Sequence, residues 1–82
     1  MNSDDRVDKV LARAEELARS GLSGINEAAM ELAELCGGDR RVIEQARRQI
    51  LHQTGAHADA ITKQIAWLIR RALELGQWNW DD

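Results

Sequence analysis

The sequence contains no proline, no phenylalanine and no tyrosine among its 82 residues. Two of the aromatic residues that favour β-strands are therefore absent. Alanine, leucine, glutamate, arginine and glutamine dominate instead, and these residues favour helices. Apolar residues make up 44% of the chain and charged residues 30%, a balance typical of globular proteins rather than disordered ones. The composition therefore predicts an all-α globular protein.

Cysteine and long apolar runs are also scarce. A single cysteine cannot form an internal disulfide. No apolar run approaches the roughly 18 residues that a membrane-spanning helix needs. The first residues, Met-Asn-Ser-Asp-Asp, lack the apolar region of a signal peptide. We therefore expect a cytoplasmic protein that does not engage a membrane.

Positive charge is in deficit as well. Eleven lysines and arginines face 14 aspartates and glutamates, which leaves a net charge of −3. This balance argues against a general binder of nucleic acid or of membrane surfaces, because both carry negative charge. A negative net charge does not exclude a basic face on one part of the surface.

Apolar residues recur at helical spacing in four segments, at about residues 4–19, 24–36, 40–54 and 58–75. Glycines stand at positions 21, 37, 38, 55 and 76, and glycine is the residue on which helices most often end. Short loops favour antiparallel neighbours. The sequence therefore predicts a compact bundle of four helices in one domain, residues 1–76, followed by a Trp-rich acidic C-terminal tail, residues 77–82.

The segment 58–75 carries the largest apolar side chains, so we expect it at the centre of the bundle. At about 100° per residue, seven of its apolar residues fall within roughly 80° of Ile65: Ala58, Ile61, Leu68, Ile69, Ala72, Leu73 and Leu75. The opposite side carries charged residues and one tryptophan: Lys63, Arg70, Arg71, Glu74 and Trp67. The charged residues belong in water, and the tryptophan among them requires an explanation.

No group of residues in the sequence predicts catalysis. Cys36 lies on the apolar face of the second predicted helix, where a cysteine acts as a small hydrophobic residue. The nearby Arg40 and Arg41 leave a reactive thiolate as the alternative. His52 and His57 do not form the i, i+4 pair of a helical zinc motif. Gly37-Gly38 follows a helix and is not part of a strand-loop-helix unit that binds phosphate. We therefore expect no enzyme, no cofactor and no metal site.

The third predicted helix is basic. It carries Arg40, Arg41, Arg47 and Arg48. With Ile50 as zero, Arg47 falls at about 60° and Arg48 at about 160°, so the arginines spread over more than one side of the helix. A helix in a DNA major groove needs polar side chains near its N-terminus, which Arg40 and Arg41 supply. The second helix, the glycine pair and this helix together fit the pattern of a helix-turn-helix motif.

One stretch of this helix resembles a known family. Arg41-Val42-Ile43-Glu44-Gln45-Ala46-Arg47, with Gly55 and Ala58-Asp59 farther on, resembles the opening of ANTAR domains, which are small three-helix RNA-binding modules of bacterial antitermination regulators. The resemblance covers about 20 residues. It implies RNA binding, with Arg47 and Arg48 as the first residues to test.

The three tryptophans allow two interpretations. Each side chain can bury on the order of 200 Å². In the first interpretation, Trp78 and Trp80 fold back over the end of the bundle, and Trp67 covers the aliphatic stems of Lys63, Arg70 and Arg71. In the second, Trp67 marks a contact surface, because an exposed tryptophan flanked by arginines is typical of an interface hot spot, and the tail is a docking segment. The second interpretation predicts a partner-binding set of Trp67, Arg70, Arg71, Trp78 and Trp80.

These observations favour a non-enzymatic module for protein-protein interaction, a small bacterial regulator or adaptor that binds a protein partner or associates with itself as a homodimer. The alternative is a nucleic-acid-binding regulator of the helix-turn-helix or ANTAR-like type, which would use the arginines of the third helix. Salt separates the two, because binding to phosphates weakens steeply as ionic strength rises.

Overall fold

The computed structural model describes residues 3–21, 24–55 and 57–78. In these residues the chain forms four helices and no strand: α1 (Ser3–Arg19), α2 (Ile25–Leu35), α3 (Arg40–Gln53) and α4 (Ala60–Leu75). The predicted all-α bundle of four helices is confirmed. The predicted ends agree with the observed ones to within two residues, and the largest difference is at the start of α4.

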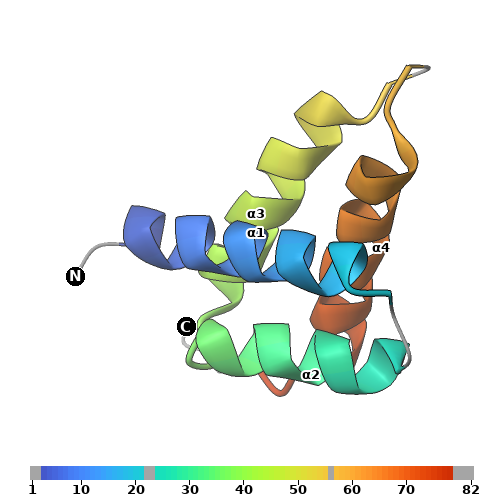
Figure 1. The fold of residues 1–82 in the computed structure, drawn as a ribbon. Coiled ribbons are helices and arrows are strands. Elements are labelled where there is room, and N and C mark those ends of the chain that lie inside the picture. The colour runs from blue at the N-terminus through green and yellow to red at the C-terminus, as the bar shows by residue number, and fades with distance from the viewer. Residues whose placement is uncertain (1–2, 22–23, 56, 79–82) are drawn as a thin grey trace.

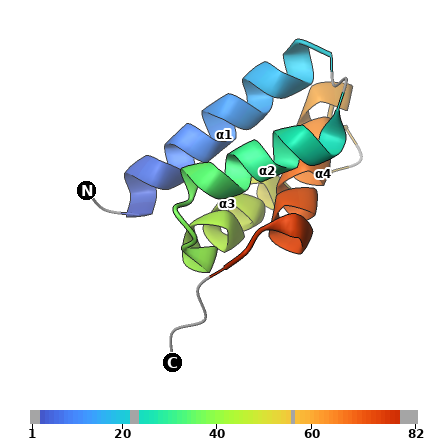
Figure 2. The same cartoon turned by 90° about the horizontal axis from the view of Figure 1, so that it is seen from below.

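The helices form two layers of antiparallel pairs. Figure 1 shows α1 and α2 side by side, running in opposite directions, with α3 and α4 crossing behind them. Figure 2 shows the same crossing from below. In both views α1 and α2 form one layer and α3 and α4 the other, so the core lies between the pairs.

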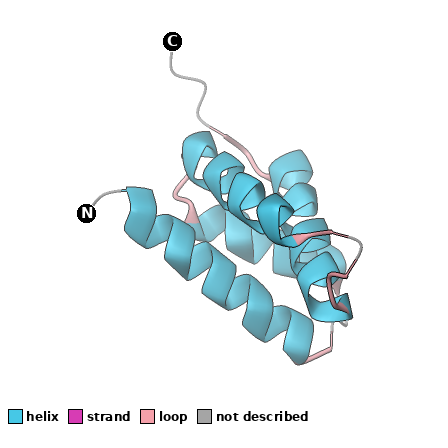
Figure 3. Ribbon diagram, turned by 90° about the horizontal axis from the view of Figure 1, so that it is seen from above, coloured by secondary structure: helices cyan, strands magenta, loops and turns pink. Residues whose placement is uncertain are grey.

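The connection between α2 and α3 moves the chain from one layer to the other. Short loops led us to expect antiparallel neighbours, but α2 packs on α1 and α4 rather than along α3. Gly37 and Gly38 in this connection have φ angles of 63° and 79°, a left-handed conformation that other residues seldom adopt. Two consecutive left-handed residues turn the chain out of the first layer. Figure 3 shows that the described part of the chain consists of helices and loops.

Polar side chains define where α3 and α4 begin. The carboxylate of Asp39 accepts a hydrogen bond from the Arg41 backbone N–H at 3.0 Å, and that of Asp59 accepts one from the Thr62 backbone N–H at 2.8 Å. Both aspartates are N-caps, which satisfy backbone donors that a first helical turn leaves free. Capping by Asp59 explains why α4 begins at residue 60. The Arg41 guanidinium lowers the pKa of Asp39, and the bond from Thr62 lowers that of Asp59.

The core combines small side chains from the first layer with larger ones from the second. Alanines on α1 and α2 allow the two layers to approach closely, while isoleucines and leucines fill the space between them. Helix α4 packs on all three other helices, as its size and pattern predicted, and α1 does so too. The buried residues are Val7, Val10, Ala14, Ala18, Ala28, Ala29, Leu32, Ala33, Cys36, Val42, Ile43, Ala46, Ile50, Ile65, Leu68, Ile69 and Ala72.

The core contains no fully buried aromatic side chain among the described residues. The two tryptophans in this part of the chain lie outside it, Trp67 exposed and Trp78 packed against its edge. Within the same residues, none of the four helices combines the length and the apolar character needed to cross a membrane.

Candidate protein-binding face on α4

Trp67 lies on the outer face of α4 with 53% of its surface exposed, more than Met30, Leu35 or Leu51, the other exposed large apolar residues of the described chain. The position follows from helical phase, because Trp67 lies about 160° from Ile65. About half of a tryptophan surface amounts to roughly 100 Å² of apolar area. Covering that area would be worth about 2.5 kcal/mol at the usual coefficient.

Charged side chains share the outer side of α4 with Trp67, and three of them form ion pairs. Glu74 Oε1 is 3.4 Å from Arg70 Nε, and Glu74 Oε2 is 3.3 Å from Arg71 Nη1. Lys63, one turn before Trp67, is exposed. We call Lys63, Trp67, Arg70, Arg71 and Glu74 the Trp67 face. It holds three cationic side chains and one carboxylate, a net charge of +2 on a chain whose net charge is −3.

A contact with α2 holds one side of this face in place. Arg71 Nε donates a hydrogen bond to Asn26 Oδ1 at 3.1 Å, although the two residues are 45 positions apart. The Arg71 side chain is 38% exposed against 72% for Arg70, so it is the more restrained of the two guanidiniums. The sequence pattern did not identify Asn26, because nothing local to it indicates that α2 crosses α4 there.

Trp78 lies against its own bundle. Its Nε1–H donates a hydrogen bond to the Leu73 carbonyl at 3.0 Å, and its ring packs on the edge of the core. The Leu73 carbonyl belongs to the last turn of α4, where backbone acceptors need partners from outside the helix. Trp78 therefore lies against the end of the bundle, as the first interpretation expects, while its predicted role in partner binding stays a prediction. Trp80 is outside the described residues.

Trp78 and Trp67 occupy different sides of α4. Leu73, which anchors Trp78, lies about 120° around the helix from Trp67. Trp78 therefore adds no second aromatic side chain to the Trp67 face. The division into a domain, residues 1–76, and a tail, residues 77–82, stays a prediction.

Gly76 makes room for Trp78, which leads to a stability prediction. A Cβ on Gly76 would lie 2.5 Å from Trp78 Cζ2 and 2.9 Å from the Ala72 carbonyl oxygen, both closer than real contacts allow. We expect Gly76→Ala to displace the indole, break its bond to Leu73 and lower the free energy of unfolding by about 1–2 kcal/mol. The fluorescence emission of the folded variant should shift to longer wavelength as the ring enters water. Urea denaturation measures the loss of stability.

Gly55→Ala is the matched control for this substitution. A Cβ on Gly55 would meet no atom within 4 Å, and Gly55 is not among the glycines with positive φ. Alanine at that position should leave emission unchanged and alter stability by less than about 1 kcal/mol. Equal effects of the two substitutions would contradict the close packing of Trp78 against Gly76.

Two of the four arginines predicted for nucleic acid form ion pairs with carboxylates of their own chain. Arg40 Nε lies 2.7 Å from Glu44 Oε1, and Arg41 Nε lies 3.2 Å from Asp39 Oδ1. The N-terminal turn of α3, which would read bases in a helix-turn-helix protein, therefore engages its guanidiniums with carboxylates of its own chain. The other two arginines are exposed farther along α3: Arg47 and Arg48.

Cys36 is fully buried, with an exposed fraction of 0%. Burial, reinforced by the negative charge of Asp39 and opposed by Arg6, raises the pKa of its thiol to about 11. A reactive cysteine needs the opposite, a lowered pKa in a partly exposed site. His52 and His57 are exposed, and no cluster of three or more metal-ligating side chains occurs in the described residues.

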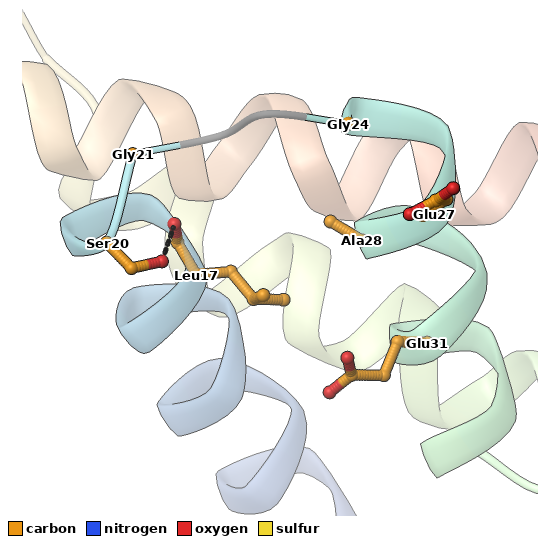
Figure 4. Close-up of a pocket in the computed structure, with 7 residues that line it drawn as sticks. All are labelled: Leu17, Ser20, Gly21, Gly24, Glu27, Ala28 and Glu31. Carbon is orange, nitrogen blue, oxygen red and sulfur yellow. Dashed lines mark hydrogen bonds between the residues drawn. The ribbon is translucent and has the colours of Figure 1, made fainter.

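A small pocket lies between the end of α1 and the start of α2. Its volume is about 180 Å³, below the roughly 300 Å³ at which small-molecule sites begin. One of its carboxylates, Glu31, accepts hydrogen bonds from Arg13 of α1, which lower its pKa. Figure 4 shows the residues that line it: Leu17, Ser20, Gly21, Gly24, Glu27, Ala28 and Glu31. The pocket is too small for a typical cofactor.

The exposed surface of α4 is thus the feature of the described chain that most resembles a binding site. The likeness of α3 to ANTAR domains stays a prediction. Comparisons with protein-family models, with curated proteins and with solved structures find no match for this chain.

Proposed function

We propose that this protein is a non-enzymatic protein-binding module, of the kind that serves as a small bacterial regulator or adaptor, and that the Trp67 face is its contact surface. The observation that carries the proposal is the exposure of Trp67, at 53%, on the middle of a helix that packs on all three others. A partner that covers the ring would therefore bind to a helix that is held in place by the other three.

Two physical features support this function. Tryptophan and arginine are enriched among the residues that dominate binding energy, and the Trp67 face combines both. The ion pairs of Glu74 with Arg70 and Arg71, and the hydrogen bond from Arg71 to Asn26, restrict the side chains before a partner arrives. Restricting them in advance reduces the entropy lost on binding.

The test is to find the partner through this face and then remove the ring. A photoreactive amino acid at position 67 should cross-link a protein in cells that the same group at position 51, also exposed on another helix, does not. With that partner purified, we expect Trp67→Ala to weaken binding by about 30-fold or more, the effect of losing a hot spot. Titration calorimetry measures the affinity, and circular dichroism should show unchanged helicity.

Leu51→Ala is the matched control, because Leu51 is 47% exposed and lies on α3. It should change the affinity less than about twofold. The proposal is wrong if both variants bind as well as the original chain, or if the position-67 reagent captures nothing beyond the position-51 control.

The alternative function is nucleic-acid binding through α3. It rests on the exposure of Arg47 and Arg48, since Arg40 and Arg41 are paired with carboxylates. Sedimentation of the pure protein with bulk RNA or DNA at two salt concentrations separates the proposals. Phosphate binding should fall steeply with salt, whereas an interface centred on Trp67 should change far less.

A further inference from the structure

We infer that the segment that docks on the Trp67 face is acidic and carries an apolar anchor. This inference rests on the proposed function and adds the chemistry of the partner. Its basis is the charge around the ring, which is opposite in sign to that of the chain as a whole. A chain with a net charge of −3 places a patch of +2 around Trp67, the most exposed large apolar side chain of its described residues.

The cationic groups flank Trp67 on both sides. With Ile65 as zero, Trp67 lies at about 200° on the α4 surface, Lys63 and Arg70 at about 140–160°, and Arg71 at about 240°. Glu74 pairs with both arginines, so one carboxylate is shared between two guanidiniums. A partner that covers the indole therefore brings its own side chains next to positive charge on either flank. Carboxylates at those positions gain charge-assisted hydrogen bonds, while lysines or arginines are repelled.

The same charges disfavour a second copy of this chain on the same face. A two-fold dimer buries the same patch of both subunits against itself. Here it would bring a net +2 against a net +2 around two indoles. Like charges in contact cost free energy and exclude wrong partners. An acidic protein segment meets no such penalty, and its apolar anchor covers the exposed ring.

The experiment selects ligands without assuming their sequence. The full chain is immobilised, and a displayed library of random peptides is panned against it, with Trp67→Ala protein as the counter-selection. Enriched peptides are synthesised and titrated by fluorescence anisotropy. We expect peptides rich in aspartate and glutamate around an apolar residue. The attraction must come from a local patch, because the net charge of the chain would repel them.

Two charge-reversed variants locate the attraction. The double variant Lys63→Glu, Arg70→Glu changes the Trp67 face, and Arg47→Glu, Arg48→Glu makes the same change in net charge on α3. We expect the first to weaken binding of the selected peptides by about tenfold or more and the second by less than about twofold. Circular dichroism verifies that both variants keep their helicity.

Each other outcome overturns the inference. Selected peptides that are neutral or basic but still require Trp67 contradict the acidic partner while leaving the proposed function intact. Equal losses in the two double variants show a general charge effect instead. A dimer in sedimentation that Trp67→Ala abolishes identifies a second copy as the occupant. A library from which no peptide survives counter-selection with Trp67→Ala protein contradicts both the inference and the proposed function.

Discussion

Replacement of Leu68 by alanine is expected to lower the free energy of unfolding by about 3–5 kcal/mol. Leu68 is fully buried, among the largest such side chains in the core. The substitution removes apolar contacts and leaves a cavity that the helices can close only in part. A domain of this size has a total stability of roughly 4–12 kcal/mol. The variant should therefore be marginally folded, with an early transition in urea followed by circular dichroism.

Leu51→Ala makes the same chemical change on the surface. Leu51 is 47% exposed, so the substitution removes less buried area than Leu68→Ala does, and alanine is a good helix former. We expect a change within about 0.5 kcal/mol. Similar losses for both leucines would show that the helices do not enclose Leu68 as described.

The thiol of Cys36 should react at least about 100-fold more slowly in the folded protein than in urea, because a pKa near 11 leaves that much less thiolate than the ordinary value of 9.0. The same shift makes stability depend on pH. Above pH 9 the unfolded chain loses the thiol proton while the folded chain keeps it until about pH 11. This contribution to stability is present below pH 9 and lost between pH 9 and 11, by roughly 2–3 kcal/mol.

Cys36→Ala isolates that contribution, because other groups titrate in the same range. The variant should lose less stability than the original chain as the pH rises from 9 to 11, on top of a constant cost for the smaller side chain. Reaction with a disulfide reagent, followed by absorbance with and without urea, measures the thiol itself. A rapid reaction in the folded state, or equal pH profiles for the two proteins, would contradict the burial of Cys36.

Helix limits were predictable from sequence because they depend on local chemistry. Asp39 precedes an apolar-periodic segment and caps the first turn of α3 through its own carboxylate. Gly21 follows the last periodic residue of α1 and takes a φ of 83°, the left-handed conformation in which helices end. Gly76 shows the limit of this reasoning. It caps α4 at a φ of −68°, and its small size serves the packing of Trp78 instead.

The candidate site also contains one feature that the sequence predicts and one that it does not. The exposure of Trp67 follows from its angle of about 160° from Ile65 around the helix, so the sequence alone predicts it. The place of Trp78 does not, because an aromatic residue after a helix can fold back or extend with equal local justification. Its hydrogen bond to Leu73 exists only once the edge of the core is assembled to receive the ring.

By itself, the sequence determined four helices, the apolar face of each and the outward position of Trp67, because helical periodicity and capping act over a few residues. Only the tertiary structure decided that the helices cross as two antiparallel pairs, that Arg71 is held by Asn26, and that Trp78 belongs to the bundle. These features depend on contacts between segments far apart in the chain. Such contacts form only where the shapes of two packed surfaces are complementary. The indole that helical periodicity places in water is therefore also exposed in the assembled domain.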